Sequence, residues 1–389
     1  MKNYMFESPT RLYFGNNEED NVGKYIKEYG FKKILLVYGK SSAKRSGLYD
    51  RVIKSLKDNK IEFLELSGVS ANPTLKKVNE GLAMIKNQNV DLVLAMGGGS
   101  VIDTAKSIAN GYYYDGNTFD FNEHKLVPIK GLPVGVILTI PAAGSEFSMS
   151  CVITDEERNM KRGYNSPTNR PLFAIESINL INGLPFEQYA YGITDILAHS
   201  IERYFSPSSE IEFADYLALG LMKSVVDATD VLLKDFNNDE AKKVIILASS
   251  ISHSGHTSLC KDIAMPVHQM EHEVSGLYPN IAHGLGLAVL FPYWMEKTYT
   301  YMPKKFAKFG EVLFNIKGED DLSSSKLTIE AFKLFLKKLG LNKSLKDLGV
   351  AYEDLEIMAQ PFVARLIPGV KPLDYSLARE ILIHAWKGE

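Results

Sequence analysis

The sequence predicts an N-terminal α/β domain built on a mostly parallel sheet, followed by an all-helical C-terminal domain. Up to about residue 180, apolar runs rich in β-branched residues alternate with helix-like stretches, as in βαβ units. After Gly183–Pro185 the apolar residues recur at helical spacing and almost no strand pattern remains. At 389 residues the chain is also too long for one ordinary domain. We therefore expect two domains, residues 1–183 and 184–389.

Four continuous apolar runs predict the strands of the first domain. Helices cover both faces of a parallel sheet, so its strands are apolar throughout rather than alternating. The runs are KILLVYG at 33–39, IEFLEL at 61–66, DLVLAMG at 91–97 and VGVILTI at 134–140. Between them, residues 41–59 and 73–88 have the apolar spacing of amphipathic helices.

Three long stretches predict the first helices of the second domain. They cover residues 185–205, 210–233 and 238–256, and their apolar residues recur every three to four positions. A further helix is expected around HQMEHEVSG at 268–276. The turn LYPN then separates it from another helix, which begins near His283.

The overall composition excludes several classes of protein. A net charge of −3 argues against nucleic acid as the main partner, because phosphate binding needs clustered positive charge. No apolar run approaches the roughly 20 residues of a membrane-spanning helix, and the start MKNYMFESPTRLYFG lacks the pattern of a secretory signal. Two cysteines without a CxxC motif predict neither a disulfide framework nor a cysteine metal site. We expect a cytoplasmic protein.

A glycine-rich turn follows the third predicted strand. DLVLAMGGGSVIDTAK runs from strand through Gly97, Gly98, Gly99 and Ser100 into a helix. Backbone N–H groups at such a helix start favour an anion, such as a phosphate or pyrophosphate. The spacing is not GxGxxG, and glycines needed only for a tight turn would give the same letters. The turn nevertheless favours a Rossmann-like dinucleotide-binding domain.

The end of the first predicted strand bears on the choice of cofactor. A dinucleotide fold often has an acidic residue there, which binds a free ribose 2′-hydroxyl. Here the strand ends in Gly39, Lys40, Ser41 and Ser42, without a carboxylate. A lysine beside two hydroxyls suits a 2′-phosphate, so we expect NADP(H) in preference to NAD(H). Lys40 as a merely solvated loop residue is the competing interpretation.

The helical half contains a cluster of potential metal ligands. Asp195 and His199 are four residues apart on one predicted helix, and His268 and His272 have the same spacing on another. With His283, about three imidazoles and one carboxylate could bind iron or zinc and leave a position open for substrate. The spacing does not choose between His268 and His272, and two further histidines compete as ligands: His253 and His256.

Four motifs carry a family resemblance. They are GGGSVIDTAK at 97–106, TIPAAGSEFS at 139–148, GITDILAHSIERYF at 192–205 and HQMEHEVSGLYPNIAHG at 268–284. In this order they resemble the iron-containing, metal-dependent (group III) alcohol dehydrogenase family, in particular its butanol dehydrogenase-like branch. The resemblance implies a dehydroquinate synthase-like fold, in which an α/β dinucleotide-binding domain and a helical metal-binding domain enclose the metal, and usually a homodimer.

The resemblance also implies roles for individual residues. The metal ligands would be Asp195, His199, His268 and His283, with His272 as the catalytic residue beside the substrate. The stretch 97–100 would bind the pyrophosphate, and VYGKSS at 37–42 matches members that prefer NADP. The other residues near the cofactor would be Asn72, Asp103, Thr139, Ser148 and Lys161.

The activity implied by the resemblance is hydride transfer between NAD(P) and a small primary alcohol or aldehyde, such as butanol or butyraldehyde. A bound metal would act as the Lewis acid. Two alternatives remain open on the sequence. One is a related metal enzyme of the dehydroquinate synthase or glycerol dehydrogenase type, and the other is a non-catalytic protein that binds nucleotide or metal.

Overall fold

The computed structural model describes residues 3–206 and 212–388, and the chain divides into two compact units. The first unit is Glu7–Pro185. The second begins at Phe186 and also includes the described residues before Glu7. The first two residues of one expected helix, Glu210 and Ile211, lie outside the described residues.

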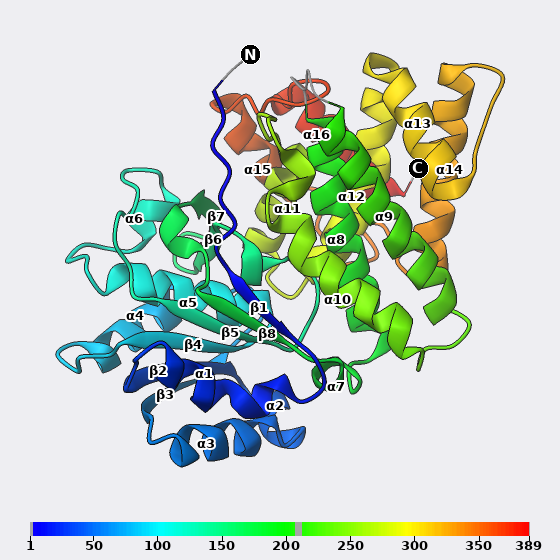
Figure 1. Ribbon diagram of the computed structural model, residues 1–389. Coiled ribbons are helices and arrows are strands. Elements are labelled where there is room, and N and C mark those ends of the chain that lie inside the picture. Colours follow the sequence, from blue (N-terminus) through cyan, green and yellow to red (C-terminus); the bar gives the residue numbers. More distant parts are fainter. Residues whose placement is uncertain (1–2, 207–211, 389) are drawn as a thin grey trace. The chain divides into compact units, whose positions relative to one another are not determined.

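The first unit is built on a parallel sheet of six strands in the order β1-β8-β5-β4-β2-β3 (Figure 1). The strands are β1 (Arg11–Phe14), β2 (Lys33–Gly39), β3 (Glu62–Val69), β4 (Leu92–Gly97), β5 (Val134–Leu138) and β8 (Phe173–Glu176). The helices of this unit are α1 (Val22–Glu28), α2 (Ser42–Arg45), α3 (Leu48–Asp58), α4 (Leu75–Ile85), α5 (Gly99–Gly111), α6 (Phe119–Asn122) and α7 (Ile178–Ile181). The predicted α/β class and all four predicted strands are confirmed.

Both faces of the sheet are covered, which explains why its central strands are apolar throughout. On β2, Ile34 and Leu36 pack into a core with residues of α1 and α3. Leu35 and Val37 point to the opposite face and are equally buried. Helices α4 and α5 pack against strands of this sheet. A run of buried aliphatic residues on each strand is the sequence signature of this two-sided arrangement.

The carboxyl ends of adjacent strands bring several predicted cofactor residues to one edge of the sheet. Strand β2 lies between β4 and β3, so the connection from β2 to β3 and the connection from β4 to β5 run in opposite directions. Ligands of open α/β sheets bind at such a switch point. Gly39 ends β2, Gly97 ends β4, and Thr139 follows β5 and donates its backbone N–H to Gly97 O at 3.1 Å.

An antiparallel hairpin, which the sequence did not predict, adjoins this edge. Its strands are β6 (Ser150–Asp155) and β7 (Met160–Asn165). The fully buried amine of Lys106 on α5 holds the residues just before the hairpin and the first residue of β6. Lys106 Nζ donates to the carbonyl oxygens of Ser145 at 2.7 Å, Ser148 at 3.1 Å and Ser150 at 2.8 Å, and to Ser145 Oγ at 2.8 Å. One lysine therefore fixes the conformation of residues 145–150.

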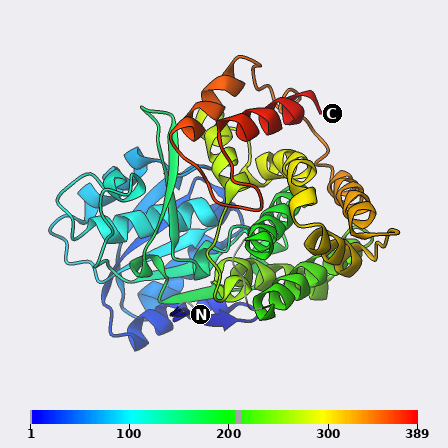
Figure 2. The same ribbon diagram turned by 90° about the horizontal axis from the view of Figure 1, so that it is seen from above.

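The second unit is helical. Figures 1 and 2 draw its described part as helices and connecting loops. The helices are α8 (Phe186–Phe205), α9 (Phe213–Leu232), α10 (Asp239–His253), α11 (Pro266–Leu277), α12 (His283–Thr298), α13 (Pro303–Phe314), α14 (Asp321–Lys338), α15 (Asp354–Ala359) and α16 (Tyr375–Lys387). Helix α8 is buried along most of its length and packs against α9, α10 and α12. Among the described helices, none is long and apolar enough to cross a membrane.

Candidate functional site

Helix α8 places three polar side chains on one face in the interior of the helical unit. Asp195, His199 and Glu202 follow one another at intervals of four and three residues, so they share a face. All three are buried. His199 Nδ1 lies 2.9 Å from the backbone oxygen of Asp195, which holds the ring along the helix and leaves Nε2 facing away from it.

Helices α11 and α12 bring two more histidines to the same carboxylate. His268 Nε2 lies 3.7 Å from Asp195 Oδ1, and His283 Nε2 lies 3.9 Å from the same oxygen. His283 is the first residue of α12, and Gly284 allows this helix to begin close to α8. A Cβ atom at Gly284 would lie 2.2 Å from the Tyr191 carbonyl oxygen on α8. Only glycine fits this approach.

Two buried atoms at the centre of this cluster need a partner. Within the described chain, neither Asp195 Oδ1 nor His268 Nε2 makes a hydrogen bond. Ligand atoms about 2.1 Å from a tetrahedral metal ion are about 3.4 Å apart, close to the 3.7 and 3.9 Å seen here. A cation bound between these atoms would satisfy both of them. The donor set, imidazole nitrogens and one carboxylate, suits iron or zinc.

The electrostatics of the cluster also suit a cation. Burial opposes ionisation of Asp195, but His199 and His283 hold the pKa of Asp195 well below its ordinary value. Burial, with the nearby charge of His268, lowers the pKa of His199 to about 4, so this ring is neutral at pH 7. Burial also acts against a charged His268, yet Glu202 and Asp195 raise the pKa of His268 to about 9. A cation would take the place of that proton.

The structure places the histidines that compete as ligands in different groups. Two sets of ligand atoms lie within 4.8 Å of one another among the described residues: Asp195 with His199 and His268, and Glu271 with His272 and His283. His272 is thus next to His283, with ring centroids 5.8 Å apart. His253 lies against the His199 ring, at 4.2 Å between centroids, but neither His253 nor His256 is in either set.

Two buried glutamates of this cluster were missed in the sequence. Glu202 Oε2 pairs with His268 Nδ1, and Glu271 Oε2 pairs with His283 Nδ1. Both carboxylates are buried. A helical-spacing signal was present, since Glu202 lies three residues after His199 and Glu271 lies three residues after His268. Their histidine partners lie on other helices, which spacing along one helix does not reveal.

In the glycine turn, neighbouring atoms leave too little space for a side chain at two positions, but they leave enough at the third. A Cβ at Gly97 would lie 2.4 Å from Val101 Cγ2, and one at Gly98 would lie 3.1 Å from Ile140 Cβ. At Gly99 the nearest atom would be Ala143 Cβ at 3.5 Å, an ordinary contact. The fold therefore does not require glycine at 99. A ligand that approaches the backbone at the start of α5, such as a pyrophosphate, would require it.

The end of β2 is rich in basic side chains. Lys40 and Ser41 are exposed, and Ser41 Oγ accepts a hydrogen bond from Arg45 Nη1. Lys44 Nζ lies 4.8 Å from the centroid of the Tyr49 ring. This concentration of positive charge would suit an anionic group.

The remaining predicted cofactor residues are linked by the β6–β7 hairpin. Asp103 on α5 accepts hydrogen bonds from Ser145 Oγ at 2.6 Å and from Val152 N at 3.0 Å. Ser148 Oγ accepts from Ser150 N at 2.8 Å. Lys161 on β7 lies opposite Thr154 on β6. The backbone N–H of Thr154 in turn donates to the carbonyl oxygen of Pro73, the residue after Asn72, at 2.8 Å. The hairpin thus connects segments that are far apart in the sequence.

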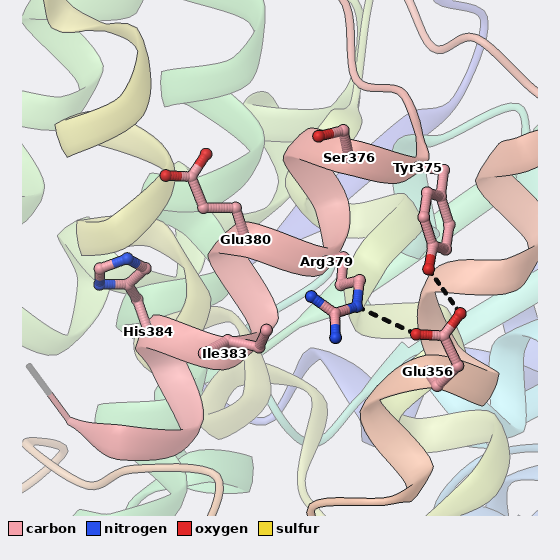
Figure 3. A pocket seen from close by; sticks show the side chains of 7 residues that line it. All are labelled: Glu356, Tyr375, Ser376, Arg379, Glu380, Ile383 and His384. Atoms are coloured by element: carbon pink, nitrogen blue, oxygen red, sulfur yellow. Dashed lines mark hydrogen bonds and ion pairs between the residues drawn. The ribbon is translucent and has the colours of Figure 1, made fainter.

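An open hollow of about 450 Å³ lies elsewhere in the helical unit, between α15 and α16 (Figure 3). Its carboxylates are already engaged. Glu356 accepts hydrogen bonds from Tyr375 Oη at 2.6 Å and Arg379 Nε at 3.0 Å, and Glu380 pairs with Lys297. It contains none of the predicted site residues, and the lining consists of Glu356, Tyr375, Ser376, Arg379, Glu380, Ile383 and His384.

Known proteins similar to this chain match it over nearly its whole length. The NADH-dependent butanol dehydrogenase A of Clostridium acetobutylicum is 37% identical over 365 residues, 93% of each chain. The crystal structure of an NADH-dependent butanol dehydrogenase A from Thermotoga maritima is 36% identical and superposes with a TM-score of 0.94 over 99% of each chain. A more distant relative is the NADPH-dependent aldehyde reductase YqhD of Escherichia coli, 27% identical over 354 residues and 90% of each chain.

Two family models cover both units. The model described as iron-containing alcohol dehydrogenase matches residues 9–176. The model described as the C-terminal part of the Fe-containing alcohol dehydrogenase family matches residues 189–374. The resemblance inferred from four motifs is confirmed, as is the two-part fold it implied. This chain belongs to the iron-containing alcohol dehydrogenase family.

Proposed function

We propose that this protein is a metal-dependent, NAD(P)-linked alcohol dehydrogenase and aldehyde reductase that acts on small primary alcohols or aldehydes, such as butanol and butyraldehyde. One observation carries the proposal: a buried, ionised Asp195 carboxylate has a nitrogen from each of three histidines within 4 Å of its Oδ1 atom. The names of the relatives, butanol dehydrogenase and aldehyde reductase, support the substrate class.

The proposed roles divide between the two parts of the chain. Residues 184–389 would hold Fe²⁺ or Zn²⁺ and the substrate, and residues 1–183 would hold the nicotinamide cofactor. The proposed ligands are Asp195, His199, His268 and His283. A carboxylate and three neutral imidazoles leave a bound divalent cation with net positive charge, as activation of an oxygen ligand requires.

The chemistry follows from charge. A bound metal would polarise an aldehyde carbonyl or stabilise the corresponding alkoxide, and the cofactor would supply or accept hydride. The protein holds its ligands ready for this task, because burial keeps His199 neutral and the nearby histidines keep Asp195 ionised. His272, next to His283, would transfer the proton between the substrate oxygen and solvent.

The cofactor would bind at the carboxyl edge of the parallel sheet. The pyrophosphate would lie on Gly97–Ser100, where Gly99 leaves room at the backbone. The proposed neighbours of the rest of the cofactor are Gly39, Lys40, Ser41, Asn72, Asp103, Thr139, Ser148 and Lys161. The homodimeric state and the cytoplasmic location expected from the sequence remain predictions.

The first test is oxidation of NADPH or NADH with butyraldehyde. Chelator-stripped protein should be inactive, and addition of Fe²⁺ or Zn²⁺ should restore consumption of the reduced cofactor, because the carbonyl is not polarised without the cation. Cofactor absorbance follows the reaction, and circular dichroism shows that the stripped protein stays folded. A folded protein that is inactive with either metal would contradict the proposal.

His272→Asn should separate proton transfer from metal binding. We expect turnover to fall by roughly 10²- to 10⁴-fold, the usual contribution of a general acid or base, while metal content remains that of the wild type. His199→Asn is the matched control and should lose metal. If His272→Asn loses metal as well, His272 is a ligand rather than the proton-transferring group.

Gly99→Ala should impair cofactor binding without harming the fold. The new methyl group meets only Ala143 Cβ at 3.5 Å, so the thermal unfolding midpoint should not fall. The dissociation constant of NADPH or NADH, measured by fluorescence titration, should rise at least about tenfold, or ~1.4 kcal/mol. Gly97→Ala is the contrasting variant and should be destabilised by about 1–3 kcal/mol because its Cβ clashes with Val101. Unaltered binding by Gly99→Ala would argue against a pyrophosphate at this turn.

The preference for NADP(H) is the finer part of the cofactor proposal. Lys40 and its basic neighbours support it, whereas the butanol dehydrogenase relatives are named NADH-dependent. If Lys40 binds a 2′-phosphate, kcat/KM will be higher with NADPH than with NADH. Lys40→Ala should then lower only the NADPH value, by roughly tenfold. A wild-type preference for NADH would refute the proposal that Lys40, at the end of β2, binds a 2′-phosphate.

A further inference from the structure

We propose that Glu202 and Glu271 are positioning residues, which hold the imidazoles of His268 and His283 so that both Nε2 atoms face Asp195. This inference rests on the proposed function, because it assigns how the metal ligands are oriented. Neither carboxylate would touch the metal. Each would act through the histidine with which it pairs.

Glu202 links helix α8 to the start of helix α11 at two adjacent residues. Its Oε1 accepts the backbone N–H of Val267, and its Oε2 pairs with His268 Nδ1. Pro266 is the first residue of α11 and has no N–H, so Val267 carries one of the first unpaired donors of this helix. Glu202 therefore fixes both where α11 begins and how the His268 ring is turned.

Glu271 on α11 orients the ring of His283, the first residue of α12. Its Oε2 pairs with His283 Nδ1 and also accepts a hydrogen bond from Ser275 Oγ at 3.2 Å. The facing helix leaves space for this side chain. A Cβ at Gly286 would lie 2.9 Å from Glu271 Cγ and 3.0 Å from Oε1. The two glycines of the HGLG sequence thus allow different contacts. Gly284 lets α8 come close, and Gly286 leaves room for the side chain of Glu271.

In each of the three histidines proposed as ligands, the ring is held through its Nδ1 atom. His199 Nδ1 faces the Asp195 carbonyl oxygen, and the other two face carboxylates. A neutral imidazole whose Nδ1–H is donated in this way presents its lone pair at Nε2. A carboxylate acceptor also makes the ring a stronger donor to a metal. The buried glutamates therefore select both the tautomer and the direction of the ligand atom.

The burial of these carboxylates supports a functional role. A carboxylate enclosed in a protein interior carries a desolvation cost that apolar packing in its place would avoid. Both glutamates are enclosed, and each is paired with a histidine that lies within 4 Å of Asp195 Oδ1. The helices form a sequence in which α8 orients a ligand on α11, and α11 orients a ligand on α12.

The test measures Co²⁺ binding by metal-stripped protein, independently of activity. Glu202→Gln places an amide between two N–H donors, so one of the two hydrogen bonds must be lost. Glu271→Gln is milder, because its amide oxygen can still accept from His283 and Ser275, and mainly the charge is removed. Glu273→Gln is the matched control on the same helix, since Glu273 pairs with Arg365 at 2.6 Å.

We expect the Co²⁺ dissociation constant to rise by roughly 10- to 100-fold in the two test variants, more in Glu202→Gln than in Glu271→Gln. Competition with a chromophoric chelator gives the constant, and the visible absorption band of bound Co²⁺ reports any change in coordination. Glu273→Gln should keep the wild-type constant and band. The unfolding midpoint of each stripped variant shows whether it folds, and Glu271→Gln keeps the test decisive if Glu202→Gln disturbs the start of α11.

The outcomes separate the two proposals. Folded Glu271→Gln or Glu202→Gln with wild-type Co²⁺ affinity and an unchanged band would overturn the positioning roles, while the proposed function would stand. Equal Co²⁺ binding by the wild type and Asp195→Ala would instead refute the metal centre itself, and the positioning roles with it. A loss of affinity in all three glutamine variants would also overturn the inference, because Glu273 is paired with Arg365 and has no part in the proposed positioning.

Discussion

The charge on Asp195 is the constraint on which the helical part of this protein depends. The carboxylate lies on a helix that is buried along most of its length, and one of its oxygens makes no hydrogen bond within the described residues. An enclosed charge of this kind is tolerated only with a compensating cation or donor. Histidines from α11 and α12 therefore join His199 of its own helix around it, and the missing side chain at Gly284 lets α12 come close enough to contribute.

Without a metal, protons supply part of that compensation. Glu202 and Asp195 raise the pKa of His268 to about 9, so this ring carries a positive charge at neutral pH. Binding of a divalent cation would displace the proton and concentrate the positive charge at the centre of the cluster. The same arrangement thus holds a proton in the absence of metal and would hold a divalent cation in its place.

The sequence predicts most of this architecture because its signals are local. Apolar strands such as residues 33–39 and 91–97 report a covered sheet, and the pair Asp195 and His199 reports a shared helix face. The edge strand β1 and its neighbour β8 were missed because each has only four residues. Strand β7, MKRGYN, was missed because charged residues and a glycine obscure its alternation.

The candidate site was less accessible to sequence reasoning than the fold. Spacing on one helix suggested His268 and His272 equally, and only the position of α11 against α8 shows that His268 lies beside Asp195 and His272 beside His283. The partners of Glu202 and Glu271 lie 66 and 12 residues away, on other helices, so no local pattern connects them. Similarly, the three glycines of the turn look alike as letters, and only their neighbours in space distinguish Gly99 from Gly97.

The enclosed amine of Lys106 has a consequence for how the α/β unit responds to its surroundings. Its four acceptors come from residues 145–150, which adjoin the edge of the sheet where cofactor binding is proposed. Mobile ions screen charges at a protein surface, but they do not reach a group inside it. The conformation of this loop is therefore insulated from ionic strength, whereas the exposed basic residues after β2 are subject to it. Salt would weaken attraction of an anionic ligand to these exposed residues and leave the conformation of residues 145–150 unchanged.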